Sequence, residues 1–299
     1  MRTRFRPDRQ LTARMALTIA LLGLVYVAFI AALVALLKSA LAVVLIAAAV
    51  LAVQYWFSDR IALLAMGAHD VTPAQQPVLH GVIDRLCATA DMPKPRVAVA
   101  DTDLPNAFAT GRNSRRAVVC VTTGLLRRLD TEELEGVLAH ELSHVAHRDV
   151  AVMTAASFLG VVAGLIARFG GRGRRGRDAE QAALVIMLVM AVSVVVYAIS
   201  FLLIRALSRY RELAADRAGA MFTGRPSALA SALTKVSGDI ARIPTRDLRT
   251  AQAFNAFFFA PALGAGPSLA ALLSTHPPLQ RRLDQLAAVA VELGKAATG

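Results

Sequence analysis

Two histidines and a glutamate in the stretch His140-Glu141-Leu142-Ser143-His144 have the residue types and the spacing of a metal site with its own base. On a helix, residues four positions apart lie on one face, so both imidazoles can reach a single ion from consecutive turns. Glu141 points to the adjoining flank, where its carboxylate can take a proton from water activated by the metal. This H-E-x-x-H spacing predicts a zinc site that hydrolyses peptide bonds.

The residues around this motif predict the helix that presents it, from Thr131 to Asp149. Asp130 followed by Glu133 is typical of a capping box at a helix start. Gly136 weakens helix propensity and would allow a neighbouring element to approach closely. Apolar residues recur at helical spacing through the segment: Leu134, Val137, Leu138, Leu142 and Val145.

A catalytic zinc ion usually has three protein ligands and a water, so a third ligand must come from elsewhere in the chain. Glu212 is the candidate, and Asp216, one helical turn further on, could orient a ligand from behind. His147 is the rival third ligand. It lies about 10.5 Å along a continuous helix from His140, which is too far for the two to share an ion easily with His144 between them. We therefore expect His147 to cap the helix or to support a ligand.

Three short segments before the motif have the pattern of strands: Arg96–Ala100, Asn106–Thr110 and Ala117–Thr122. The residues between the last two, Gly111 to Ser114, favour a turn. An extended peptide can add as a strand to an exposed sheet edge, so a peptidase could bind its substrate here. A purely structural hairpin explains the same pattern equally well.

The whole composition indicates a membrane protein, because 56% of the 299 residues are hydrophobic and the mean hydropathy is +0.53. Met15–Leu37 and Ser39–Phe57 are uncharged runs, each long enough to cross a hydrocarbon core of about 30 Å, and together they predict a transmembrane hairpin. A signal peptide is the alternative interpretation of the first run. The apolar core of a signal peptide is shorter than Met15–Leu37, however, and in this chain a second long apolar run follows at once. After the motif, Val150–Ala167 and Ala182–Ile204 predict either a second hairpin or buried core helices.

The net charge of +12 is mostly arginine, near the N-terminus and between residues 168 and 177. In a membrane protein such charge reports topology and contact with anionic lipid, and no basic motif interleaved with aromatic residues argues for nucleic acid. The positive-inside rule places the N-terminus, and after two crossings the motif, in the cytoplasm. Two further crossings between His144 and Glu212 would return the chain to the same side of the membrane, so that both halves of the site can meet. Cys87 and Cys120 lie outside any metal or redox spacing and indicate partly buried thiols in a reducing compartment.

Two further segments frame the predicted site. Residues from Asp59 to about Ala90 are expected to be helical, with His69 and His80 as ordinary helix residues. Near the C-terminus, Pro277 biases His276 away from helical geometry at the entry to a helix. His276 could be a cap only, or it could donate a hydrogen bond to the oxyanion of the reaction.

Taken in order, these motifs resemble the HtpX-type membrane zinc metalloproteases of the M48 class, relatives of the Ste24-type CAAX prenyl proteases. The resemblance runs from the N-terminal hairpin through Pro105–Gly111, the H-E-x-x-H helix, the second hairpin, Ser208–Asp216 and Thr275–Pro277. It departs in two places. An Asn or a small residue commonly stands where this chain has His147. The loop Arg168–Glu180 is rich in arginine, although it would be extracytoplasmic if the second hairpin crossed fully.

The resemblance implies roles for individual residues. His140, His144 and Glu212 would bind one zinc ion, Glu141 would be the general base, and His276 would stabilise the transition state. The implied substrate-binding edge consists of Asn106, Ala107, Phe108, Ala109, Thr110 and Gly111.

We therefore expect a mainly α-helical fold with a small β-sheet, an integral membrane zincin-like metallopeptidase with a discontinuous catalytic domain. The expected divisions are a cytoplasmic N-terminus (1–14), a transmembrane hairpin (15–57), the first catalytic part (58–149), a second hydrophobic hairpin (150–204) and the second catalytic part (205–299).

The resemblance also implies a zinc endopeptidase of the bacterial inner membrane that cuts misfolded or damaged membrane proteins at the cytoplasmic face under envelope stress. Its expected partners are those substrates and the lipid bilayer, not nucleic acid, and a homo-oligomer stays open. One alternative is the processing of a single membrane-anchored or prenylated peptide. Another is a catalytically silent membrane scaffold, which Glu141 disfavours because a closed structural zinc site has no use for a free base.

Overall fold

The computed structural model describes residues 9–37, 66–111, 113–149, 179–242 and 276–297, with isolated residues between 45 and 64 and between 152 and 163. Two predicted hydrophobic runs, Ser39–Phe57 and Val150–Ala167, lie largely outside the described residues. Most of the arginine-rich loop Arg168–Glu180 lies outside them as well.

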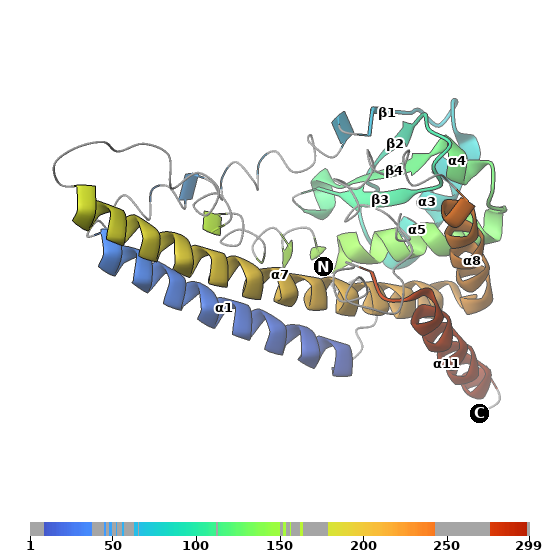
Figure 1. Ribbon diagram of the computed structural model, residues 1–299. Coiled ribbons are helices and arrows are strands. Elements are labelled where there is room, and N and C mark those ends of the chain that lie inside the picture. Colours follow the sequence, from blue (N-terminus) through green and yellow to red (C-terminus); the bar gives the residue numbers. More distant parts are fainter. Residues whose placement is uncertain are drawn as a thin grey trace.

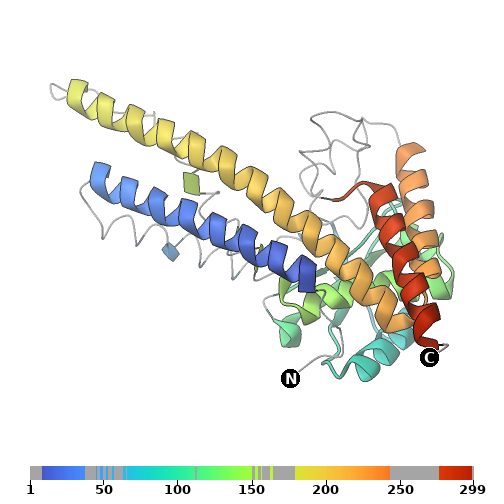
Figure 2. The same cartoon turned by 90° about the horizontal axis from the view of Figure 1, so that it is seen from below.

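Two long helices lie side by side and extend away from the rest of the molecule (Figures 1 and 2). They are α1 (Arg9–Leu37) and α7 (Ala179–Thr223), and we call them the helix pair. Each contains a segment long and apolar enough to cross a membrane, Arg9–Leu36 in α1 and Leu184–Thr223 in α7. The apolar runs predicted around these positions are thus helical.

Apolar side chains line the seam of the helix pair and also its outer surface. Leu22 and Phe29 of α1 are buried in the same cluster as Val189 and Val196 of α7. On the outside, Val27 is 67% exposed. Helices that are apolar all round are typical of membrane spans.

The C-terminal part of α7 extends past α1 into a domain built on a four-stranded sheet with the order β1-β2-β4-β3 (Figure 1). The strands are β1 (Ala68–Asp70), β2 (Arg96–Ala100), β3 (Ala107–Thr110) and β4 (Val118–Thr122). β2 and β4 are parallel, and the two outer pairings are antiparallel. The three predicted strands agree with β2, β3 and β4 to within one residue at each end.

The first strand corrects the sequence interpretation. Ala68–Asp70 forms β1 where a helix was expected, so His69 is a strand residue, whereas His80 lies in a helix as expected. Three residues at a sheet edge, of which two are exposed, are too short to show an alternating pattern.

The sheet is buried on both faces, and every residue of β4 is buried. Val119 and Val121 pack among the helices on one face, while Val118 and Cys120 pack on the other. Alternate residues of a strand point to opposite faces, which explains this division. Cys120 and Cys87 are both buried free thiols.

The remaining helices of the domain are α3 (Pro77–Ala90), α5 (Thr131–Ala146), α8 (Pro226–Arg242) and α11 (Leu279–Ala297), with short turns α4 (Thr123–Leu126) and η1 (Ser114–Arg116) beside the sheet. α8 packs on α5, and α11 packs on α7 and α8. Of these, α5 packs against β3, α7 and α8 (Figure 1). It therefore joins the sheet to the continuation of the helix pair.

Glycines allow the close contacts of α5. A Cβ atom added to Gly219 of α7 would lie 3.0 Å from the backbone nitrogen of His140, and one on Gly136 would lie 3.2 Å from the nitrogen of Leu229 in α8. The predicted role of Gly136 in close approach is thus confirmed, and Gly219 lets α7 touch the backbone of the motif itself.

Candidate metal centre

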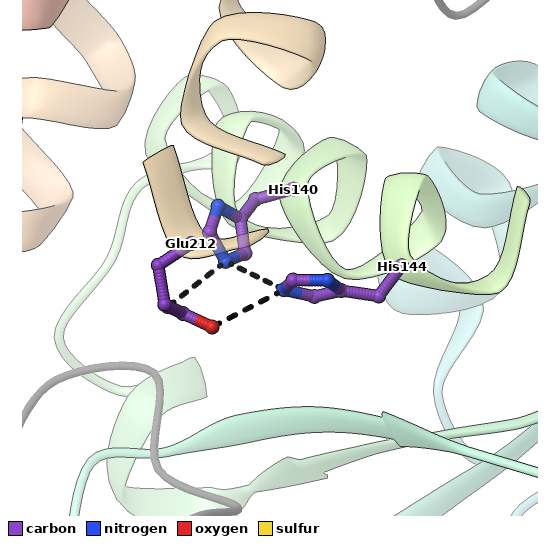
Figure 3. Close-up of side chains that lie close together, drawn as sticks. All are labelled: His140, His144 and Glu212. Atoms are coloured by element: carbon purple, nitrogen blue, oxygen red, sulfur yellow. Dashed lines mark hydrogen bonds and ion pairs between the residues drawn. The ribbon is translucent and has the colours of Figure 1, made fainter. Parts of the chain in front are cut away.

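The side chains of His140 and His144 project from α5 one turn apart, toward Glu212 on α7 (Figure 3). Their Nε2 atoms lie 3.2 Å apart. The Glu212 carboxylate lies 3.7 Å from Nε2 of His140 and 3.5 Å from Nε2 of His144. One potential ligand atom from each residue lies within 4.8 Å of the others. The structure therefore brings the three predicted ligands from two separate segments to one point.

The donor chemistry of this cluster fits a cation. Nδ1 of His140 lies 2.9 Å from a carboxylate oxygen of Asp216, and Nδ1 of His144 lies 2.6 Å from Oδ2 of Asp149. A proton on each Nδ1, facing these carboxylates, leaves a lone pair on each Nε2. Two lone pairs and the Glu212 carboxylate then converge, and two imidazoles with one carboxylate form a common zinc donor set.

Each of the two aspartates is also held by an arginine. Asp216 accepts hydrogen bonds from Nε and Nη2 of Arg282, at 2.7 and 2.6 Å, and both side chains are fully buried. Asp149 pairs with Nη2 of Arg211 at 2.9 Å. Each imidazole is therefore backed by an aspartate that an arginine neutralises.

The end of α5 differs from the prediction and explains the position of Asp149. The helix ends at Ala146, three residues before the expected end, and His147 is its C-cap. Arg148 then adopts a left-handed conformation with φ of 57°. This turn places Asp149 against His144, whereas Nδ1 of His147 lies 2.7 Å from the carbonyl oxygen of Ser143. The predicted cap is thus found at His147.

The predicted base, Glu141, is buried beside the edge strand. Its Oε2 accepts a hydrogen bond of 2.9 Å from the backbone nitrogen of Ala109 in β3. Burial raises the pKa of the Glu141 carboxyl, and the opposing charges of His140 and His144 only partly offset this effect. A carboxyl with a raised pKa is suited to accepting and returning a proton.

The predicted substrate edge therefore lies directly against the predicted base. β3 is one of the two edge strands of the sheet, opposite β1. Asn106 at its start is held on the inner side, because its carbonyl accepts a hydrogen bond from the nitrogen of Thr122. Ala109 directs its N–H the other way, toward α5.

His276 also reaches the cluster, from just before the start of α11. Its side chain is buried, and its Nδ1 lies 3.2 Å from Oε2 of Glu212. Arg282 approaches the same oxygen at 3.8 Å. The C-terminal segment thus contributes two side chains around the carboxylate of Glu212, one from just before α11 and one from within it.

Comparison with known proteins identifies the family. Residues 73–290 match Peptidase family M48. The chain belongs to this family. The M48 chain is 66% identical over 298 residues to Protease HtpX homolog 1 of Streptomyces coelicolor, a match that covers 99% of this chain and 98% of that one. It is 54% identical to Protease HtpX homolog of Moorella thermoacetica, which covers 96% of each chain. The protein is therefore a metalloprotease.

A solved structure, that of Ste24p from S. mikatae, resembles the M48 chain with a TM-score of 0.52 and 18% sequence identity. The match covers 91% of this chain and 64% of that one. At this identity the likeness concerns the fold alone. It confirms the expected class, mainly helical with a small sheet and long apolar helices.

Three residues around the cluster were not identified from the sequence: Asp149, Arg211 and Arg282. Arg211 directly precedes Glu212, and Arg282 follows His276 in the same C-terminal segment, so both signals were available beside predicted residues. Asp149 was hidden because the expected helix ran through it. A helix that continued to residue 149 would have directed its carboxylate away from His144.

Proposed function

We propose that this M48 metalloprotease is a zinc-dependent endopeptidase, with His140, His144 and Glu212 as the metal ligands and Glu141 as the general base. The observation that supports it most directly is the convergence of two Nε2 lone pairs on the Glu212 carboxylate, with a buried carboxyl beside them. A structural metal site would not need Glu141.

A bound zinc ion would acidify a water and polarise the scissile carbonyl. Glu141 would take the proton of the attacking water and pass it to the leaving amine. The hydrogen bond from the Ala109 nitrogen holds one oxygen of Glu141 against the edge strand. A substrate added as a strand beside Ala107–Thr110 would therefore bring its backbone to the base.

The supporting residues take roles that follow from their contacts. Asp216 orients His140, His147 caps α5, and His276 acts near Glu212 as the stabiliser of the transition state. The substrate edge is the strand from Asn106 to Gly111. Residues 58–149 and 205–299 form one catalytic domain interrupted by 150–204.

We further propose that the substrates are misfolded or damaged membrane proteins cut at the cytoplasmic face of a bacterial inner membrane. The support is that α7 carries both an apolar segment and Glu212, so the third metal ligand lies on a candidate membrane helix. The alternative substrate is one membrane-anchored or prenylated peptide.

The number of cleavage sites separates these two substrates. The full chain would be purified in detergent, stripped of metal with a chelator and given zinc together with casein. Quality control predicts zinc-dependent cutting at many positions, and processing predicts a single cut in a defined peptide with casein left intact. Zinc binding without any cutting, by wild type and Glu141→Gln alike, would favour the silent scaffold instead.

A further inference from the structure

The chain leaves the sheet domain after α5 through a turn that puts a carboxylate behind the second motif imidazole. Arg148, directly after the C-cap, adopts a left-handed conformation. Asp149 is buried, and its Oδ2 lies 2.6 Å from Nδ1 of His144. A non-glycine residue in this conformation is unfavourable and persists only where its surroundings enforce it.

Arg211 completes the arrangement from α7. Its Nη2 lies 2.9 Å from the same oxygen of Asp149, and both side chains are 12% exposed. Hydrogen bonds between charged groups in such a sheltered place are stronger than those on an open surface. Arg211 also adjoins Glu212 in the chain, so one turn of α7 approaches His144 with a carboxylate on one side and braces its aspartate on the other.

We propose that Asp149 and Arg211 are positioning residues of the metal site. Asp149 holds the Nδ1–H of His144 and fixes the plane of the ring, so that Nε2 faces Glu212, and Arg211 holds the Asp149 carboxylate in place. This inference rests on the proposed function, because it assigns the two residues to the support of a metal ligand.

The same arrangement recurs at the other motif histidine, where Asp216 lies between His140 and Arg282. The two aspartates come from different segments, one after α5 and one within α7. In the sequence, Asp149 directly precedes the predicted second hydrophobic hairpin (150–204), and Arg211 follows it. The ion pair between them therefore joins the entry and the exit of that segment at His144.

The test measures metal binding rather than cleavage. Zinc affinity of the purified full chain would be determined by competition with a chromophoric chelator for wild type, Asp149→Asn and Arg211→Met. We expect both variants to bind zinc about 10- to 100-fold more weakly. They should also show a shifted visible spectrum when loaded with Co²⁺, because the geometry at His144 changes.

Arg217→Met is the matched control. Arg217 also lies on α7 and pairs with a carboxylate, but that carboxylate is Glu292 of α11 and not an aspartate beside an imidazole. The Arg217→Met variant should bind zinc as wild type does. Thermal unfolding of each protein in the presence of a chelator checks that the metal-free fold is retained. If Arg211→Met does not fold, Arg211→Lys replaces it. Because this variant keeps the positive charge, its zinc affinity should lie between those of wild type and Asp149→Asn.

A double variant, Asp149→Arg with Arg211→Asp, separates positioning from a simple clasp between the two chain ends. The exchange keeps an ion pair but offers His144 a donor in place of an acceptor. We expect its zinc affinity to stay low. Recovery of wild-type affinity in this double variant, or wild-type affinity in Asp149→Asn, would overturn the inference. A wild-type chain that bound no zinc would overturn the proposed function and this inference together, whereas equal binding by all variants would overturn the inference alone.

Discussion

Glu133 shows how a single buried residue can serve both local and tertiary structure. It forms the predicted capping box with Asp130, with hydrogen bonds of 2.9 and 3.1 Å. Its carboxylate also accepts hydrogen bonds from Ser231 and Lys235 of α8, at 2.6 and 2.7 Å. Glu133 therefore caps the start of α5 and also attaches α5 to α8.

These contacts predict a pH-dependent contribution to stability. Burial alone would raise the pKa of Glu133, but the hydrogen bonds from Lys235, Ser231 and the Asp130 nitrogen outweigh it and lower the pKa below 4.5. Because the pKa is depressed in the folded state, the contribution is present above the unfolded pKa and disappears as pH falls through the folded pKa. Lys235→Met should therefore melt below wild type at pH 7, with a difference that shrinks on acidification below about pH 4.5.

Thermal unfolding of the metal-free chain at several pH values measures this difference. Lys94→Met is the control, because the partner of Lys94 is Asp84, whose side chain is 55% exposed against 4% for Glu133. A Lys235→Met deficit that stayed constant from pH 7 to pH 3 would contradict the assignment.

At the same scale, the sequence was sufficient for residues whose role depends on spacing and insufficient for those that depend on a turn. The shared face of His140 and His144 follows from helical periodicity, and the capping box follows from the spacing of Asp130 and Glu133. Asp149 depends on the left-handed conformation of Arg148, and arginine carries no local signal for that conformation.

At the scale of elements, the approach of α7 to α5 sets the distance between Glu212 and the two imidazoles. Gly219 permits this approach, because a Cβ there would lie 3.0 Å from the His140 nitrogen. Gly219→Ala should therefore push the helices apart, lower the free energy of unfolding by about 1–3 kcal/mol and weaken zinc binding.

Gly238→Ala is the matched control on α8, where an added Cβ meets nothing within 4 Å. There the substitution should stabilise the helix by roughly 0.5–1 kcal/mol, because alanine has the higher helix propensity. Calorimetry of both variants tests the pair. If Gly219→Ala were as stable as Gly238→Ala and bound zinc as wild type does, the close contact would not govern the site.

The elements themselves were predictable to different degrees. β2, β3 and β4 are apolar runs with turn residues between them, so their pattern identified them. β1 is three residues long and held by pairing with β2, a tertiary contact that leaves no pattern in the sequence.

At the scale of the whole molecule, the apolar outer surface of the helix pair is the feature that a soluble protein would not tolerate. Val27 of α1 is 67% exposed, and Val78 of α3, in the sheet domain, is 60% exposed. If the helix pair lies in lipid, Val27→Arg places a charge in hydrocarbon at a free-energy cost of about 2.5–3.5 kcal/mol. Val78→Arg places the same charge in water, where this cost does not arise.

Carbonate extraction of membranes from expressing cells compares these two variants. Val27→Arg should reduce the amount of integrated protein, and Val78→Arg should leave it unchanged. Equal integration of both variants would argue that α1 does not contact lipid.

The sequence predicts that the two halves of the site lie on one side of the membrane, which stays a prediction, and it gives no information on how the two halves meet. Hydropathy counts the crossings and their order. It cannot show that α7 is one continuous helix from its apolar segment to Glu212, or that His276 and Arg282 of the C-terminal segment surround that glutamate. Those contacts depend on how distant segments pack.

The most direct test of the central claim is a single comparison of bound zinc and casein cleavage in wild type and Glu141→Gln. The account predicts that both proteins bind one zinc ion per chain with similar affinity, because Glu141 is not a ligand, and that only wild type cleaves. Cleavage by Glu141→Gln at the wild-type rate would show that this carboxylate is not the base and that the hydrolytic site lies elsewhere.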